Sequence, residues 1–183
     1  MLIDEACSQL RPLLRRTMAP RGQPPVFLHS KYYNDKVSMM GALTLSPRRG
    51  HLGFYCSTLS QESFDDWGTA WFLKQLLAHQ RGKIIVVWDQ GRIHRGPAVR
   101  ALLAKHPRLK VVELPAYAPE LNPVEFVWSY LKYGRICNVG AKDVKALSGI
   151  LETELDRLQD NQSLLKKLWH RSGLPWPDRL LAS

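Results

Sequence analysis

Asp89 stands directly after the apolar run Ile84–Trp88, within the segment KIIVVWDQG. That run is rich in β-branched residues and bounded by charge and glycine, which predicts a central parallel strand buried on both faces. Open α/β sheets bind ligands at the carboxyl ends of such strands, and a carboxylate buried there needs a cation or a metal ion beside it. The alternative is that Asp89 caps the following turn, with Arg92 or Arg95 meeting its charge.

A second acidic residue, Glu125, lies in the first turn of an expected amphipathic helix, within LPAYAPELNPVEFVWSYLK (114–132). Asn122 at the N-cap, Pro123 at N1 and Glu125 at N3 match a capping box, which accounts for the spacing without any active site. The proline-rich lead-in nevertheless fixes the helix start near the sheet edge that carries Asp89. Helical geometry puts Glu125 at the margin of the apolar stripe, where a side chain can face a cleft. The residues alone leave both roles open.

Asp4 ends the short apolar segment Leu2–Ile3. If that segment is a strand beside the central one, Asp4 reaches the same edge of the sheet as Asp89. Acidic residues near an N-terminus are more often solvated, so this signal is weak by itself.

The elements that would position these acids alternate between strand patterns and helix patterns. Five of them precede or follow the central strand: two strands over 37–46 and 51–60 that form a hairpin around Pro-Arg-Arg-Gly, a helix within 61–80 capped by Ser60 or Ser63, a short helix over 97–105, and a strand over 109–114. Residues 84–114 therefore have the size and order of a βαβ crossover.

Three further helices are expected after residue 120: one from about Asn122, one over about 142–158 and one over about 164–170. Phe126 and Tyr130 point away from the core face of the first, so we expect the terminal helices or a partner to cover them. The tail PWPDRLLAS has little pattern. With no repeat and no linker, we expect one α/β domain over 1–183, with a core of about 1–133 and C-terminal helices over about 141–171.

The composition points to an anionic partner. The chain of 183 residues carries 26 basic and 16 acidic residues, a net charge of +10, which favours nucleic acid over a merely basic surface. Cys7, Cys56 and Cys137 are odd in number and form no CxxC pair, which argues against a disulfide framework and a zinc knuckle. No apolar run approaches about 18 residues and no signal-peptide pattern opens the chain, so we expect a cytosolic protein with no membrane partner.

WDQGRIHR followed by LPAYAPELNPVEFVWSYLK closely resembles the signature of DDE transposases, specifically bacterial insertion-sequence transposases related to the mariner superfamily. Upstream, IDEA and RRTMAPRGQPP are similar to the first acidic motif of that family and the basic loop behind it. The interval from Asp89 to Glu125 also suits the group. The resemblance spans roughly residues 3–132, and its second and third motifs together are highly specific.

This resemblance implies a ribonuclease-H-like mixed five-stranded sheet flanked by helices, with Asp4, Asp89 and Glu125 as catalytic residues and metal ligands. The implied cofactor is a pair of Mg²⁺ or Mn²⁺ ions, because hard cations prefer oxygen ligands and two ions about 3.5–4 Å apart activate the nucleophile and stabilise the leaving oxygen. The implied reaction is cutting of double-stranded DNA at transposon ends, followed by strand transfer to target DNA at a TA step. A bacterial, nucleoid-associated protein that forms a homodimer is expected.

Three departures from the family pattern are visible. Gln90 stands where Asn is common, and Met18 stands where Trp is common. Few residues precede Asp4, so we expect a shortened N-terminal strand and a separate or missing helix-turn-helix module, as in a truncated or frameshifted product.

Two other groups of residues are candidates for contacts around the site. His94 and Arg95 could contact a phosphate or orient a ligand, although a lone His is more often structural. Arg11, Arg15, Arg16 and Arg21 form a possible DNA-backbone patch, with solvated charge as the alternative.

The sequence thus favours a metal-dependent transposase catalytic domain. Two alternatives remain: an inactive remnant that serves as a non-catalytic DNA-binding or assembly module, and a ribonuclease-H-like nuclease with another substrate.

Overall fold

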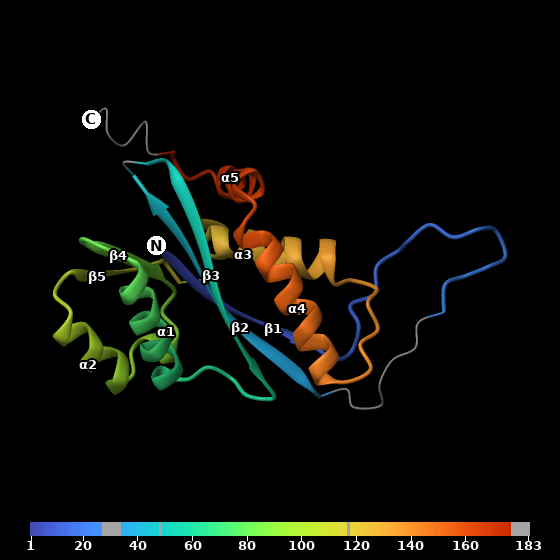
Figure 1. Ribbon diagram of the computed structural model, residues 1–183, viewed down its shortest axis with the longest axis horizontal. Helices are drawn as coiled ribbons and strands as arrows, with labels where there is room; N and C mark the ends of the chain where they lie inside the picture. Colours follow the sequence, from blue (N-terminus) through green and yellow to red (C-terminus); the bar gives the residue numbers. More distant parts are fainter. Residues whose placement is uncertain (27–33, 48, 117, 177–183) are drawn as a thin grey trace.

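The computed structural model describes residues 1–176 except 27–33, 48 and 117. Five strands form one mixed sheet in the order β3-β2-β1-β4-β5, with helices on both faces (Figure 1). Arg48 of the expected hairpin turn, Tyr117 of the proline-rich segment and most of the tail lie outside the described residues. The expected five-stranded mixed sheet flanked by helices is confirmed.

The antiparallel half of the sheet consists of β1 (Leu2–Gln9), β2 (Lys36–Ser46) and β3 (His51–Ser60). The expected hairpin of β2 and β3 is confirmed, because these strands pair antiparallel along their whole length. β2 also pairs antiparallel with β1, so that Asp4 lies opposite Gly41.

The first strand is longer than its apolar start indicated. β1 continues through the polar residues after Ile3 and spans eight residues, so it extends well beyond the apolar segment that Asp4 ends. Its ladder with β2 holds this polar stretch extended, and a sequence pattern of isolated apolar residues does not report such pairing. Few residues of β1 precede Asp4. At its other edge β1 pairs in parallel with β4, and in the described residues this pairing joins Leu2 to Val87.

The parallel half of the sheet is the expected βαβ unit. β4 (Ile84–Trp88), α2 (Pro97–Lys105) and β5 (Leu109–Glu113) follow one another, and β4 and β5 pair in parallel. The expectation that β4 is buried on both faces was wrong, because Ile85 is 57% exposed. α1 and α2 cover only one face at this end of the sheet, so the apolar run alternates between core and surface.

α1 (Asp66–His79) begins later than expected. Its N-cap is Asp65, whose side chain accepts a hydrogen bond from the backbone N–H of Gly68, and neither Ser60 nor Ser63 caps it. Its buried residues join α2 and one face of the sheet in a cluster that includes Ile3, Met40 and Trp88. This first layer covers the face to which Ile3 points.

The opposite face carries the C-terminal helices. α3 (Pro123–Tyr130) passes into a π-helical turn over Leu131–Arg135, and α4 (Val144–Gln159) and α5 (Gln162–Arg171) follow. Their buried side chains pack with Leu2 and the neighbouring face of β2 and β3. Successive residues of a strand point to opposite faces, so Leu2 and Asp4 face α3 while Ile3 and Glu5 face α1.

Two other expectations concern the surface. Phe126 is partly buried, and the guanidinium of Arg171 in α5 lies 5.7 Å from its ring centroid, so a terminal helix does cover it.

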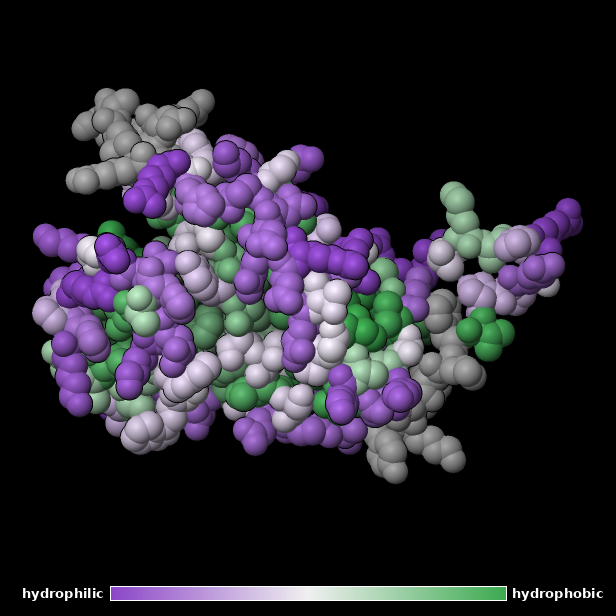
Figure 2. All heavy atoms as spheres, in the orientation of Figure 1, coloured by the Kyte–Doolittle hydropathy of each residue, from purple (hydrophilic) through white to green (hydrophobic). Residues whose placement is uncertain are grey.

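Residues 11–26 leave the body as an extended arm (Figures 1 and 2). Met18 on this arm is fully exposed, which is why a Trp there is not needed for packing within this chain.

Candidate active site

Asp4 projects from β1 toward α3. Nε1–H of Trp128 donates a hydrogen bond to Oδ2 of Asp4 at 3.0 Å. The indole reaches this position because Gly41, which lies opposite Asp4 on β2, has no side chain: a Cβ at Gly41 would lie 2.7 Å from two atoms of the Trp128 ring. Sequence reasoning treated Trp128 only as a core residue, and its contact with the acid depends on pairing between distant segments.

The environment of Asp4 disfavours its charged form. Burial is the largest cause, followed by the negative charges of Glu125, Glu5 and Asp89, and together they raise the pKa of Asp4 from 3.8 to about 8. A hydrogen bond from the backbone N–H of Glu5 acts in the opposite direction. Asp4 is thus a partly buried carboxyl that is affected by the charges of both other predicted site acids, and no cation is among the influences on its pKa.

Asn122 attaches the start of α3 to β1. Its Oδ1 accepts a hydrogen bond from the backbone N–H of Val124 at 3.2 Å, which confirms the expected N-cap. Its Nδ2 donates to the carbonyl of Ile3 at 3.1 Å, and the side chain is buried. This second bond was not foreseen, and it places the first turn of α3 beside the residue that precedes Asp4.

Glu125 does not complete a capping box. The backbone N–H of Asn122, which a capping-box glutamate would accept, donates instead to the carbonyl of Pro119 at 2.9 Å. Burial and Asp89 raise the pKa of Glu125, while nearby Lys132 lowers it. The local capping explanation is therefore not what holds this carboxylate in place.

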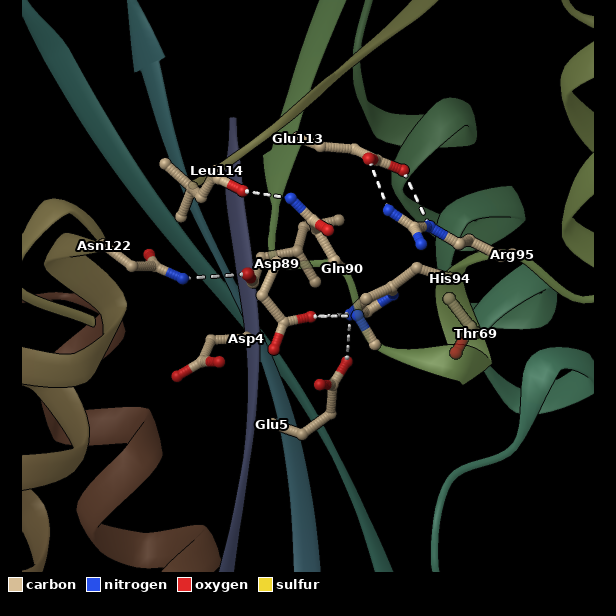
Figure 3. A network of polar contacts seen from close by, with 12 residues as sticks. Asp4, Glu5, Thr69, Asp89, Gln90, His94, Arg95, Glu113, Leu114 and Asn122 are labelled. Carbon is tan, nitrogen blue, oxygen red and sulfur yellow. Dashed lines mark hydrogen bonds and ion pairs between the residues drawn. The ribbon is translucent and has the colours of Figure 1, made fainter. Parts of the chain in front are cut away.

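Asp89 follows β4, and its side chain contacts the backbone of the loop that it begins. Its Oδ1 accepts a hydrogen bond from the backbone N–H of Gly91 at 2.8 Å, as the turn-capping interpretation expected. The side chain in contact with it belongs neither to Arg92 nor to Arg95: Nε2 of His94 lies 3.2 Å from the same oxygen (Figure 3).

Arg95 pairs with a different carboxylate, across the end of β5. Its guanidinium donates to both carboxylate oxygens of Glu113, at 2.9 and 2.5 Å (Figure 3). Gln90, which replaces the Asn common in the family, donates from Nε2 to the carbonyl of Leu114 at 3.2 Å. Both contacts join the loop after β4 to the end of β5. The loop that contains Asp89 is therefore held by contacts to a neighbouring strand.

Within the ranges that the structure describes, no three His, Cys, Asp or Glu side chains stand close enough to hold one ion together. Asp4, Asp89 and Glu125 are nevertheless near enough for their charges to affect one another, and all three offer the oxygen ligands that hard divalent cations prefer. The donor chemistry therefore fits a divalent ion, although the three side chains do not converge on one point.

A mixed sheet of this order, with acids on β1, after β4 and on the helix after β5, defines a ribonuclease-H-like domain with a candidate acidic active site. The model of the DDE superfamily endonuclease family matches residues 1–148, so the chain belongs to that family. The expected membership of the DDE family and the expected fold are confirmed.

Solved structures of Mos1 transposase share the fold. The chain matches the Mos1 strand transfer complex with a TM-score of 0.66 and 16% identity, over 97% of this chain and 52% of that one. It matches a Mos1 mariner paired-end complex with Mn with a TM-score of 0.65 and 17% identity, over 94% of this chain and 53% of that one. For the Mos1 catalytic domain the TM-score is 0.61 at 13% identity, over 97% and 78% of the two chains.

The chain thus spans about half the length of the Mos1 complexes. No curated protein matches its sequence. Among the described residues, no helix has both the length and the apolar character needed to cross a bilayer.

Proposed function

We propose that this chain is the catalytic domain of a DNA transposase related to the mariner group, which hydrolyses DNA phosphodiesters and joins the freed strand to target DNA. The observation that carries the proposal is the grouping of three acids from separate elements. Asp4 on β1 is partly buried, and after burial itself the charges of Glu125 on α3 and of Asp89 after β4 help to raise its pKa to about 8. A folded chain keeps such repulsion where it serves a function, because the arrangement costs stability in the absence of a cation.

Asp4, Asp89 and Glu125 would hold two Mg²⁺ or Mn²⁺ ions in this proposal. The bound ions would activate the attacking water or 3′-hydroxyl and stabilise the leaving oxygen. The chain contributes a fixed position for each acid. Trp128 restrains Asp4, the Gly91 amide restrains Asp89, and the capped start of α3 carries Glu125.

Double-stranded DNA, as transposon ends and as target, is the proposed partner. The net charge of +10 favours a polyanion, and Arg11, Arg16 and Arg21 are exposed on the arm. Arg15 is held differently, since Nη1 donates to the carbonyl of Tyr133 at 2.8 Å and its backbone pairs with the side chain of Asn138. A separate helix-turn-helix module would recognise the ends, and a homodimer would bring two ends together.

The test is nicking of a supercoiled plasmid and of a labelled duplex by the purified chain with Mg²⁺, with Mn²⁺ and with chelator. We expect metal-dependent cutting that Asp89→Asn or Glu125→Gln abolishes, while the exposed control Asp156→Asn retains it. Cutting that survives both site substitutions would refute the assignment of the acids. Faster cleavage of the RNA strand of a hybrid duplex than of DNA would indicate a nuclease with another substrate.

One observation favours a second candidate, a non-catalytic DNA-binding or assembly module. In the described part of the chain the acids do not gather tightly enough to hold one ion. A module of this kind would bind duplex DNA at full strength in chelator and would cut with neither metal. The same gel-shift and nicking assays separate the two candidates, because a catalytic domain must cut once metal is supplied.

A further inference from the structure

His94 occupies a buried position close to β1, which carries Asp4, and to the end of β4, which Asp89 follows. It ends the single turn Arg92–His94 after β4, and only 4% of its surface is exposed. Its ring stacks on Trp88, with centroids 4.4 Å apart and planes inclined by 16°. This stacking fixes the plane of the imidazole, so the direction of its ring nitrogens is set by the core.

Nε2 of this imidazole faces two carboxylates. It lies 3.2 Å from Oδ1 of Asp89 and 3.5 Å from Oε1 of Glu5 (Figure 3). Two acceptors on one side favour a hydrogen on Nε2, and Asp89 is the nearer of the two carboxylates. Among the described residues Nδ1 has no hydrogen-bond partner, so Nε2 is the ring nitrogen that contacts other polar groups.

Glu5 reaches His94 because β1 alternates its side chains. Asp4 points toward α3 and Glu5 toward the face covered by α1 and the turn after β4. Oε1 of Glu5 is buried without a hydrogen-bond partner in the described residues, and at 3.5 Å its contact with Nε2 is one of charge. The imidazole therefore joins the residue after Asp4 to Asp89 across the boundary between β1 and β4.

We propose that His94 is a positioning residue for Asp89: with the Gly91 amide it holds Oδ1, so that Oδ2 is the oxygen presented to a divalent cation. This rests on the proposed function, since it assumes that Asp89 binds metal. Figure 3 shows the second oxygen of Asp89 turned away from His94, on the side where Asp4 lies. The hydrogen bond from the Gly91 amide alone leaves the carboxylate free to rotate about it, whereas the close approach of the fixed His94 ring to the same oxygen restricts that rotation.

The test is direct Mn²⁺ binding to the full chain at one fixed pH, followed through the electron paramagnetic resonance signal of free Mn²⁺. His94→Leu keeps an apolar side chain against Trp88 and removes the donor, and we expect a loss of affinity of about tenfold or more. His94→Gln carries an amide N–H near the position of Nε2 and should retain most of the affinity. Loss in the first variant with rescue in the second is the pattern that positioning predicts.

Three comparisons keep the test decisive. The same substitution at the exposed His79 should leave Mn²⁺ binding unchanged. If Asp89→Asn binds Mn²⁺ as tightly as the parent chain, the proposed metal site is wrong. If Asp89→Asn loses affinity and His94→Leu does not, the positioning role is wrong and the metal site stands.

Folding of each variant is checked by circular dichroism. Where His94→Leu does not fold, His94→Met supplies a donor-free side chain of greater flexibility, and the same loss is expected from it. Nicking gives a second readout: a positioning defect should be relieved by excess Mn²⁺, because saturation compensates for weakened binding. A defect that persists at saturating Mn²⁺ with unchanged affinity would overturn the proposal.

Discussion

Asp4→Asn should stabilise the metal-free chain while removing a metal ligand. In the folded chain the pKa of Asp4 is raised from 3.8 to about 8, so the folded state binds this proton more tightly than the unfolded state. The stability is then fully present below about pH 4 and is lost as the pH rises toward 8. At about 1.4 kcal/mol per pKa unit, the loss is on the order of 4 kcal/mol near pH 7 and about 6 kcal/mol above pH 8.

Asparagine removes the titration and keeps an oxygen that can accept the hydrogen bond from Trp128. The assay is urea unfolding in chelator, followed by circular dichroism, for the parent chain and Asp4→Asn at several pH values. The two chains should be nearly equal below about pH 4, and the variant should become increasingly more stable up to about pH 8. Added Mg²⁺ should stabilise the parent chain and have little effect on the variant.

Asp156→Asn is the matched control, because Asp156 is exposed on α4 and the substitution is the same. Its effect should stay within about 0.5 kcal/mol at every pH. A difference between the parent chain and Asp4→Asn that does not change between about pH 4 and pH 8 would refute the reasoning, since the cost of burying a charged carboxylate beside other acids must follow its ionisation.

Two further substitutions test how the acids are held. Gly41→Ala should destabilise the chain by about 1–3 kcal/mol in urea unfolding, because the new methyl group meets the Trp128 ring at 2.7 Å, and an unchanged midpoint would contradict this contact. Asn122→Ala removes the cap of Val124 and leaves the Ile3 carbonyl without its donor, so a loss of about 1–3 kcal/mol is expected. Stability within a few tenths of the parent value would show that this link to β1 is unimportant.

Local patterns were sufficient to predict most elements of the fold. The alternation of residues 37–46 and 51–60 predicted the hairpin, and the β-branched run before Asp89 with the segment over 97–114 predicted the βαβ unit. These predictions succeed because strand pairing in a hairpin and a short crossover depends on residues close together in the chain. The burial of β4 was misjudged because helix coverage of a sheet face depends on segments far away.

The sequence by itself determined the candidate acids, the N-cap of α3 and the motifs that identify the family. Only the tertiary structure decided how these acids are held. The extended course of β1, the contact of Trp128 with Asp4 and the position of His94 between Glu5 and Asp89 all join residues from separate segments. The physical reason is that a carboxylate responds to burial and to charges within a few ångströms, and its neighbours in space are selected by the register of the sheet and the packing of α3, which local sequence patterns do not specify.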